Sequence, residues 1–386
     1  MGNKGTPVCH YFTREWVKMG YNVRVVHCQN VFPRPYYWLM RLNREKLAAK
    51  TGAVVYTERD RGGCFEMDGV KICRIPLLKL VPHGKFLKRV IDKTVKKIIN
   101  WLHTESFTPG TIVGHFPNPQ IELVGRLKDF WPQAKCAIVM HGDIGLAKKV
   151  YGDRLVDLCQ KIDLWGFRSD HVRKSFIRYV MPVERSFICY SGIPEHYITQ
   201  ENQHDFNRPL HNFIYVGEMI ERKYPLRVID ALEKAYPDGN YKLTYVGNGK
   251  LLNEISSRIE RDGLTERVTA LGKIPRDSIK EQYDNADCMV MISRGEAYGL
   301  VYLEAMARGC ITIASRNEGF DGVIRDGENG FLCKAGDADE LTSIILRINA
   351  LTSAERQQIS DNAIATACSL TDYKAAKRYI EDLING

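Results

Sequence analysis

The stretch from Ser293 to Gly309 constrains the fold of this chain more than any other part of the sequence. It reads SRGEAYGLVYLEAMARG and lies between two apolar runs, Cys288–Ile292 and Cys310–Ala314, that are predicted to be buried strands. Leu300–Arg308 is predicted to be a helix, because a glycine frees the backbone at each of its ends. This order of elements places backbone N–H groups and the positive end of a helix at the mouth of a parallel sheet. We therefore expect the loop to hold an anion, most naturally a phosphate.

Two carboxylates flank this loop, Glu296 within it and Glu304 on the second turn of the helix. Glu304 stands in a segment that is otherwise apolar, so its carboxylate requires a partner. One interpretation is an ion pair with a basic residue of a neighbouring helix. The other is that both carboxylates accept hydrogen bonds from hydroxyl groups, of a sugar at Glu296 and of a ribose at Glu304.

The length of 386 residues suits two domains of about 150 to 200 residues each. No apolar run approaches the length of a membrane span, and the first residues lack the apolar core of a signal peptide. The 11 cysteines are scattered without a Cys-x-x-Cys pair, as is usual in a reducing compartment. These features predict a cytoplasmic protein.

The charge is divided unevenly along the chain. Residues 1–190 contain 32 Lys and Arg against 16 Asp and Glu, a net charge of +16, whereas residues 191–386 have a net charge of −7. The first half is therefore expected to favour an anionic surface, and charge alone does not separate anionic lipid from nucleic acid.

The strongest amphipathic pattern in the first half is Lys85–His103. Eight apolar residues follow helical spacing and six cations fill the other side. The pattern fits a helix that packs on the core with a solvated basic face. A helix that lies on an anionic membrane surface is the alternative.

The start of the chain is unusual for an α/β domain. Gly5 lies in a loop, and Thr6-Pro7 begins a helix that is predicted to end at Gly20, but no strand precedes the loop. In a doubly wound domain the first strand lies at the centre of the sheet and leads into such a loop. We therefore expect a strand of about five to seven residues to be missing upstream of Met1.

His141 follows the predicted strand Ala137–Met140, at the end of a parallel strand where open α/β sheets bind ligands. A ligand-binding histidine and a loop histidine satisfied by backbone groups both fit this position. Later elements include a polar linker at Glu195–Pro209 and a second α/β segment from Phe213 onward.

Glu296-x7-Glu304, with Tyr298, Gly299 and Leu300 inside it, resembles the signature of the family 4 retaining glycosyltransferases of GT-B architecture. Further segments match the family in order: Val216-Gly217 with Arg222-Lys223, Val246-Gly247-Asn248-Gly249, Leu271-Gly272 and Asp326–Phe331. The resemblance covers nearly all of Phe213–Leu346 and is looser in the first half.

The resemblance implies an α/β fold of two Rossmann-like, doubly wound domains that face each other across a cleft. Residues 1–192 would form the acceptor-side domain and residues 193–368 the nucleotide-sugar domain. A C-terminal helix within 369–386 would cross back to the first domain.

The resemblance also implies a retaining, metal-independent hexosyltransferase. It would move a sugar from a nucleotide-diphosphate donor such as a UDP-sugar to a glycan or lipid-linked acceptor, in surface polysaccharide biosynthesis at the inner face of the membrane. Its catalytic residues would be Glu296, His141, Arg222 and Lys223; its donor-binding residues Gly217, Gly247, Ile274, Tyr298, Gly299, Leu300 and Glu304; and Gly5 would lie on the acceptor side. The resemblance implies no cofactor and no divalent metal.

One residue departs from the family pattern. Glu218 stands directly after Gly217, where the family has an arginine. Either Arg222 supplies that charge alone or the phosphate site is weaker than usual.

Two other functions were weighed. A nicotinamide-dependent dehydrogenase would need Gly-x-Gly-x-x-Gly after a strand, and Gly247-x-Gly249 lacks the third glycine. An inactive GT-B scaffold that binds membrane or nucleic acid would fit the basic first half and Glu218. We expect a nucleotide sugar and its acceptor as partners, with an anionic membrane surface at Lys85–His103, and no nucleic acid.

Overall fold

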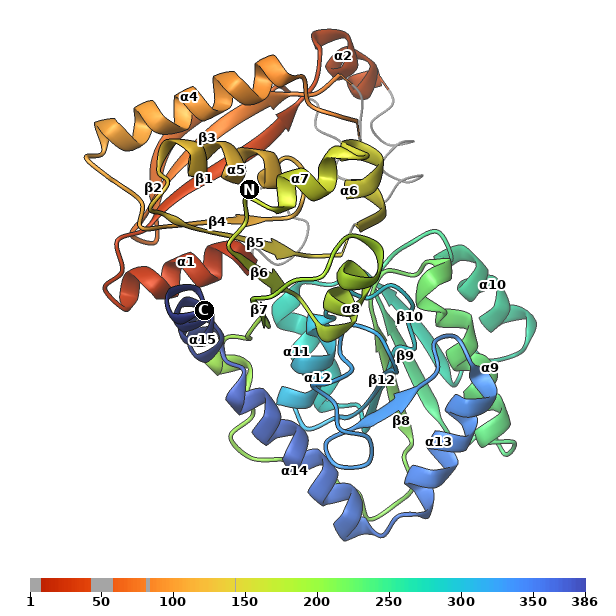
Figure 1. The fold of residues 1–386 in the computed structure, drawn as a ribbon. Coiled ribbons are helices and arrows are strands. Elements are labelled where there is room, and N and C mark those ends of the chain that lie inside the picture. The colour runs from red at the N-terminus through yellow and green to blue at the C-terminus, as the bar shows by residue number, and fades with distance from the viewer. Residues whose placement is uncertain (1–7, 43–57, 81–83, 143) are drawn as a thin grey trace. The chain divides into compact units, whose positions relative to one another are not determined.

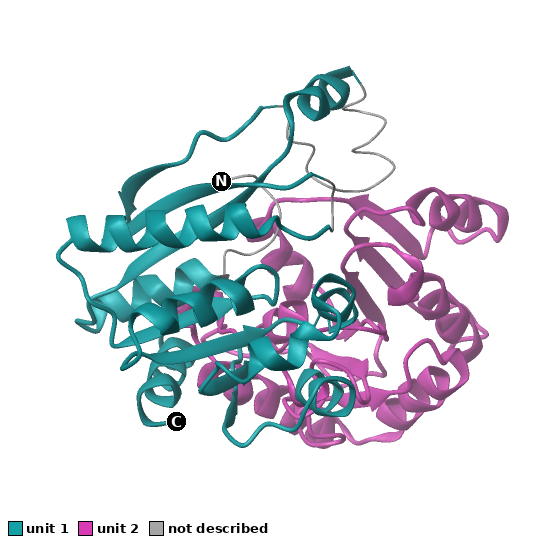
Figure 2. Cartoon of the chain, turned by 45° about the horizontal axis from the view of Figure 1, so that its top comes forward, with its two compact units in different colours: residues 1–168, 172–190, 373–386 teal, residues 169–171, 191–372 magenta. Residues whose placement is uncertain are grey.

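The structure, a computed structural model, describes residues 8–42, 58–80, 84–142 and 144–386. The chain divides into two compact units, shown in different colours in Figure 2. Unit 1 comprises Met1–Arg168, Val172–Tyr190 and Tyr373–Gly386, and unit 2 comprises Ser169–His171 and Ser191–Asp372. The chain was expected to change domain at residues 192 and 368, and the units change at 190 and 372.

Unit 1 contains both strands and helices along its length (Figure 1). They are α1 (Val8–Lys18), β1 (Arg24–Val31), α2 (Arg34–Leu42), β2 (Gly63–Met67), β3 (Val70–Leu78), α4 (Lys88–Thr104), β4 (Thr111–His115), α5 (Gln120–Phe130), β5 (Lys135–Met140), α6 (Ile144–Tyr151), α7 (Arg154–Cys159), β6 (Leu164–Phe167), α8 (Asp170–Tyr179), β7 (Ser186–Ile188) and α15 (Asp372–Asn385).

The described strands of unit 1 form two sheets. One has the order β1-β3-β2 and the other is the parallel sheet β4-β5-β6-β7, so β1 and β4 each lie at the end of a sheet. β2 and β3 form a hairpin through Asp68 and Gly69, whose positive φ angles of 52° and 75° suit a tight two-residue turn. No described strand joins β1 to β4, and the expected strand upstream of Met1 stays a prediction.

The C-terminal helix α15 packs in unit 1, as the fold class predicted. The indole Nε1 of Trp16 on α1 donates a hydrogen bond of 2.8 Å to the backbone oxygen of Ala376 on α15. Phe12, Tyr379 and Leu383 are buried in the same hydrophobic cluster. Residues far apart in the sequence thus share one core.

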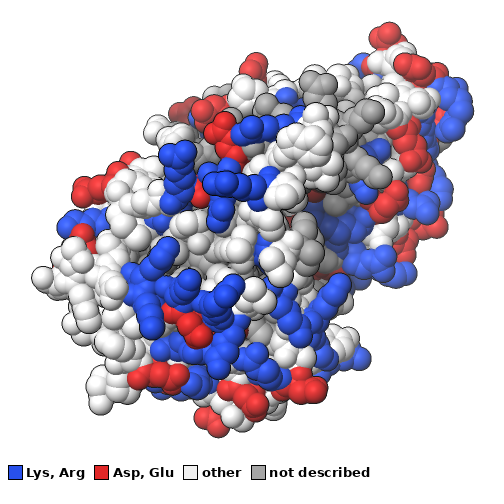
Figure 3. Space-filling model, turned by 90° about the horizontal axis from the view of Figure 1, so that it is seen from above, with Lys and Arg blue, Asp and Glu red and all other residues white. Residues whose placement is uncertain are grey.

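Helix α4 covers most of the predicted segment Lys85–His103. Ile91, Ile98 and Leu102 are buried in the core of unit 1, so its apolar face packs against the protein. The cations of the segment, Lys85, Lys88, Arg89, Lys93, Lys96 and Lys97, are all exposed. Figure 3 looks onto the side of the molecule on which α4 lies and shows Lys and Arg gathered there. The core-packed interpretation of this helix is therefore correct.

Unit 2 contains one parallel sheet of six strands in the order β10-β9-β8-β11-β12-β13. Its strands are β8 (Asn212–Val216), β9 (Lys242–Val246), β10 (Val268–Gly272), β11 (Cys288–Val290), β12 (Ile311–Ser315) and β13 (Phe331–Cys333). Its helices are α9 (Pro225–Ala235), α10 (Leu252–Arg261), α11 (Arg276–Asp284), α12 (Leu300–Ala307), α13 (Ala338–Ala350) and α14 (Ser353–Ser369), with 3-10 turns at Glu195–Tyr197 and Glu221–Lys223. Two α/β units with largely parallel sheets confirm the predicted fold class.

Several local predictions were wrong or fall outside the described residues. The Pro-rich, aromatic segment 31–37 predicts a loop, but α2 begins at Arg34. The sequence also predicts a short basic helix over 39–50 and a strand over 54–57. The end of the helix and the whole strand lie outside the described residues. None of the helices within the described ranges is long and apolar enough to cross a membrane.

Candidate active site

The N-terminus of α12 lies where the sequence placed it, after β11 in the middle of the unit 2 sheet. Gly299 adopts a left-handed conformation with φ 90° and ψ 66°, and it has no side chain to cap the helix. The N–H groups of Gly299 and Leu300 find no acceptor among the residues that the structure describes. These two groups are therefore free to bind an anion.

Glu296 and two cations meet beside this helix end. Lys223 Nζ lies 3.0 Å and Arg222 Nη1 4.0 Å from Glu296 Oε2. The side chains of Lys223 and Glu296 are 12% and 16% exposed, so the pair is largely shielded from water. The backbone N–H of Glu296 donates a hydrogen bond of 3.0 Å to Glu318 Oε2, which fixes the loop.

Glu296 Oε2 is buried but accepts no hydrogen bond from any described residue. Lys223 is close enough for an ion pair, but its approach to this oxygen lacks hydrogen-bond geometry. A buried acceptor that is left unused is costly for the protein. The oxygen is therefore suited to a hydroxyl group of a ligand.

Glycines bring the loops after β8 and β9 into direct contact. A Cβ atom added to Gly247 would lie 1.9 Å from the backbone oxygen of Gly217, and one added to Gly249 would lie 2.3 Å from the backbone oxygen of Met219. Lys223 Nζ would lie 3.7 Å from a Cβ at Gly217, so the first loop also borders the cations. Only glycine allows this approach.

Glu304 is buried and paired. Arg276 on α11 donates two hydrogen bonds to Glu304 Oε1, of 2.9 and 2.6 Å. Burial raises the pKa of Glu304, and the Arg276 guanidinium opposes that shift. The ion pair expected by one interpretation is present, but both hydrogen bonds go to one oxygen, so Oε2 keeps the capacity to accept a hydroxyl group.

The remaining donor-binding candidates are placed differently. The hydroxyl of Tyr298 donates a hydrogen bond of 2.9 Å to the backbone oxygen of Ser191, and its ring packs on Phe320. Tyr298 is buried and thus holds the loop in place. Ile274 follows β10 and is half-buried. Glu218 is exposed, and its backbone oxygen accepts a hydrogen bond from Tyr215.

His141 lies in unit 1, directly after β5. Its Nε2 atom is 2.9 Å from Nδ1 of His115, and its ring stacks on Phe116. Burial lowers the pKa of His141 to about 2, with His115 and Arg168 adding to the shift. The ring is therefore neutral at physiological pH. Gly5 lies outside the described residues.

Cys9, His115 and His141 form the one group within the described residues whose spacing could suit a metal ion, since their ligand atoms lie within 4.8 Å of one another. Such a site needs a thiolate, but burial raises the pKa of Cys9 to about 11. The Arg168 guanidinium lowers the pKa of both imidazoles and would repel a divalent cation. A metal that bound here would have to displace the thiol proton and overcome this repulsion.

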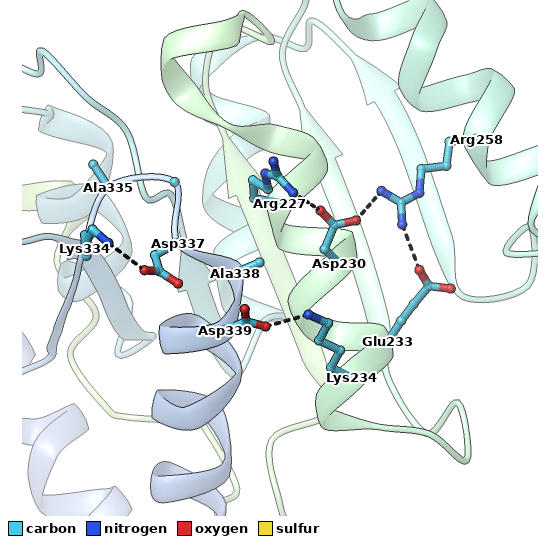
Figure 4. A pocket seen from close by; sticks show the side chains of 11 residues that line it. Arg227, Asp230, Glu233, Lys234, Arg258, Lys334, Ala335, Asp337, Ala338 and Asp339 are labelled. Carbon is cyan, nitrogen blue, oxygen red and sulfur yellow. Dashed lines mark hydrogen bonds and ion pairs between the residues drawn. The ribbon is translucent and has the colours of Figure 1, made fainter.

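A separate cavity of about 660 Å³ in unit 2 is lined by α9 and the start of α13 (Figure 4). Asp230 accepts hydrogen bonds from Arg227 and Arg258, and Lys234 pairs with Asp339. None of its lining residues belongs to the candidate site. Because its charges pair with one another, this cavity carries no evident chemistry.

Sequence reasoning missed residues that shape the site. Arg276 donates hydrogen bonds to Glu304, and Glu318 accepts one from the backbone N–H of Glu296. The backbone N–H of Arg294 donates a hydrogen bond of 2.7 Å to the backbone oxygen of Arg222. His115 was also missed. Their positions depend on contacts between segments far apart in the sequence, although the position of His115 at the end of a strand was a usable signal.

Comparison with known proteins matches most of unit 2 to one protein family. Residues 198–366 match the family described as glycosyl transferases group 1. N-acetyl-alpha-D-glucosaminyl L-malate synthase of Bacillus anthracis is 34% identical over 124 residues, 32% of each chain. Phosphatidyl-myo-inositol mannosyltransferase of Mycobacterium leprae is 35% identical over 109 residues, 28% of each chain. The chain thus aligns with about a third of the length of these relatives.

Among solved structures, Anabaena Alr3699/HepE in complex with UDP superposes with a TM-score of 0.66. The match covers 94% of this chain and 100% of that one at 18% identity, which shows the fold alone. The match to this structure supports the predicted GT-B fold, and residues 198–366 resemble the group 1 glycosyl transferases. The group 1 match covers less than half of the chain and lies within unit 2.

Proposed function

We propose that this protein is a retaining glycosyltransferase that transfers a sugar from a nucleotide-diphosphate donor to a glycan or lipid-linked acceptor. The observation that carries the proposal is the buried, unused acceptor oxygen of Glu296 beside Lys223, Arg222 and the free N–H groups of α12. The cations and N–H groups would bind a diphosphate, and the Glu296 oxygen would accept a hydrogen bond from a sugar hydroxyl. All of these groups lie at one place in unit 2.

The residues of the site have distinct tasks in this proposal. Lys223, Arg222 and the N–H groups of Gly299 and Leu300 stabilise the negative charge that develops on the leaving diphosphate. Glu296 orients the sugar through a hydroxyl group, and Glu304 Oε2 accepts from a ribose hydroxyl. Because these cations stabilise the phosphates, a divalent metal is not required.

Retention of configuration follows from attack on the same face that the diphosphate leaves, with a phosphate oxygen taking the proton of the acceptor hydroxyl. No second carboxylate is needed as a nucleophile in this scheme, unlike in a retaining glycosidase. One relative, described as an amylovoran biosynthesis glycosyltransferase of Erwinia amylovora, supports an acceptor of the glycan type. We propose surface polysaccharide as the product, made at the cytoplasmic face of the membrane.

The direct test is calorimetric titration of the full chain with UDP and GDP sugars, followed by a transfer or donor-hydrolysis assay. We expect one nucleotide to bind and its sugar to be turned over, with EDTA lowering the rate less than twofold. A strict requirement for Mg²⁺ or Mn²⁺ would contradict the role given to Lys223 and Arg222. Binding of DNA or vesicles without any nucleotide binding would favour an inactive adaptor instead.

The exposed basic face of α4 supports peripheral binding to an anionic membrane, because each cation near such a surface contributes about 1 kcal/mol. Charge reversal of Lys88, Arg89, Lys96 and Lys97 is expected to abolish cosedimentation with vesicles that contain phosphatidylglycerol. The apolar face is buried, so binding should be electrostatic and should weaken steeply with salt.

The matched control for this experiment reverses four exposed cations of unit 2: Lys234, Lys242, Arg261 and Arg325. The net charge then changes equally, but α4 is intact, and binding should persist. Equal loss in both variants would show that net charge alone attracts the vesicles and would remove the role of α4.

A further inference from the structure

A line of three polar side chains runs through unit 1 from Tyr379 to His141. Tyr379 Oη on α15 lies 3.1 Å from Nε2 of His115, and Nδ1 of His115 lies 2.9 Å from Nε2 of His141. His115 ends β4, and Tyr379 is only 1% exposed. These two contacts use both ring nitrogens of His115 and leave one nitrogen of His141, Nδ1, for another partner.

Both imidazoles in this line are neutral. Burial lowers the pKa of His115 to about 3 and that of His141 to about 2, and the Arg168 guanidinium adds to both shifts. A neutral imidazole carries a proton on one nitrogen and a lone pair on the other. Which nitrogen carries the proton is set by the hydrogen bonds that the ring makes.

The hydroxyl group of Tyr379 determines which atom donates and which accepts in both hydrogen bonds of this line. Burial raises the pKa of Tyr379 well above its usual value, so the hydroxyl keeps its proton. Among the described residues its one hydrogen-bond partner is His115 Nε2. If Nε2 carried the proton instead, the buried hydroxyl proton would have no acceptor, which is costly.

The protons of the two rings follow from this direction. Tyr379 donates to His115 Nε2, so His115 carries its proton on Nδ1. His115 Nδ1 then donates to His141 Nε2, and His141 carries its proton on Nδ1. No hydrogen bond within the described part of the chain uses that N–H group, so it remains available to a ligand.

We propose that Tyr379 and His115 are positioning residues that fix His141 as its Nδ1–H tautomer, so that His141 meets its ligand as a hydrogen-bond donor. The inference rests on the proposed function, and the ligand of His141 would be an oxygen atom of the transferred sugar. The stacking of His141 on Phe116, with ring centroids 4.0 Å apart, restrains the ring plane. The opposite tautomer would offer a bare nitrogen to the same oxygen.

The tautomer can be measured on the full chain without any substrate. Long-range ¹H–¹⁵N correlation spectra of histidine-labelled protein report which ring nitrogen carries the proton, and the His141→Gln variant assigns the signals. We expect a protonated Nδ1 on His141 in the parent protein and a mixture of tautomers in Tyr379→Phe. A bare Nδ1 on His141 in the parent protein would overturn the proposal.

The effect on the reaction is measured with the same variants. Tyr379→Phe keeps the packed ring and removes only the hydroxyl, and we expect about a tenfold loss in kcat with little change in thermal stability. Tyr373→Phe, an exposed residue of the same helix, is the matched control and should retain full activity.

Variants of His115 separate a relay from simple packing. His115→Gln keeps an acceptor and a donor on one side chain and should retain more activity than His115→Leu, which keeps neither. Equal activity of the two would reduce His115 to a packing role and overturn the proposal. So would a stoichiometric zinc ion that is lost in Cys9→Ser, because a metal would occupy the nitrogens that the relay uses.

The experiments distinguish a failure of the proposed function from a failure of the role given to Tyr379. If no nucleotide sugar is turned over by the parent protein, the proposed function is wrong, but the spectra still show whether Tyr379 sets the tautomer of His141. If turnover is found and the spectra show a bare Nδ1, the relay is wrong and the proposed function stands.

Discussion

Replacing Lys223 by alanine is expected to lower the rate of donor-dependent transfer by about 100-fold or more, the usual loss on removing one group that stabilises transition-state charge. Lys223 Nζ lies 3.0 Å from Glu296 Oε2 in a largely buried position, so water replaces its charge poorly. The loss should fall mainly on kcat, because the negative charge on the diphosphate grows as the bond to the sugar breaks. Steady-state kinetics with the donor identified by calorimetry provide the measurement.

Lys234→Ala is the matched control for this variant. Lys234 is exposed and pairs with Asp339 at the surface of the same unit, so its removal should change neither the rate nor the stability measurably. If Lys223→Ala stays within twofold of the parent protein, Lys223 does not act on the diphosphate and its assignment is lost.

Replacing Glu304 by glutamine is expected to weaken donor binding about 10- to 100-fold, because hydrogen bonds to charged groups are the stronger ones. The same change leaves Arg276 without its carboxylate partner and should also lower the melting temperature. The single variant therefore mixes a loss of ligand contact with a loss of stability, and a second variant is needed to separate them.

The double variant Arg276→Met/Glu304→Gln makes this separation. Removing both charged partners should restore stability, since no unpaired charge remains, but it does not restore the charged acceptor for ribose. We expect the melting temperature to recover while donor affinity stays low. If donor affinity also recovers, Glu304 is a structural ion-pair residue and its role at the ribose is wrong.

Arg276→Met alone tests the same assignment through pH. The guanidinium lowers the pKa of Glu304 against the effect of burial, so its removal should raise that pKa further. Glu304 would then take up its proton at a higher pH, and donor affinity should begin to fall at a higher pH than in the parent protein. An unchanged acid limb would mean that Glu304 does not bind the donor as a carboxylate.

Local patterns in the sequence predicted the second unit well. The placement of glycines predicted the loop before α12 and its left-handed Gly299, and apolar runs predicted the buried strands beside it. Both signals depend only on residues that are close together in the sequence. The helix α4 was likewise found from its periodicity. The direct contact between Gly217 and Gly247 was not predicted, because it joins the ends of two strands.

Helix α14 shows why some elements escaped prediction. Its buried face includes Arg356, Ser360 and Ala363 together with a single large apolar residue, Ile359, so it lacks the periodic apolar stripe that marks most helices. Thr352 and Glu355 form a capping box at its start, which was the available signal. Pairings such as Arg276 with Glu304 depend on tertiary packing and have no local signature.

The contact between the glycine loops also limits how this protein could acquire a different donor. A methyl group at Gly247 or Gly249 would overlap the backbone of the neighbouring loop, so neither position can be used to add a side chain that reads another base or sugar. New specificity would have to come from positions that already carry side chains, such as Ile274 after β10. Substitutions that alter donor preference are therefore expected in the loop after β10, and both glycines are expected to stay unchanged.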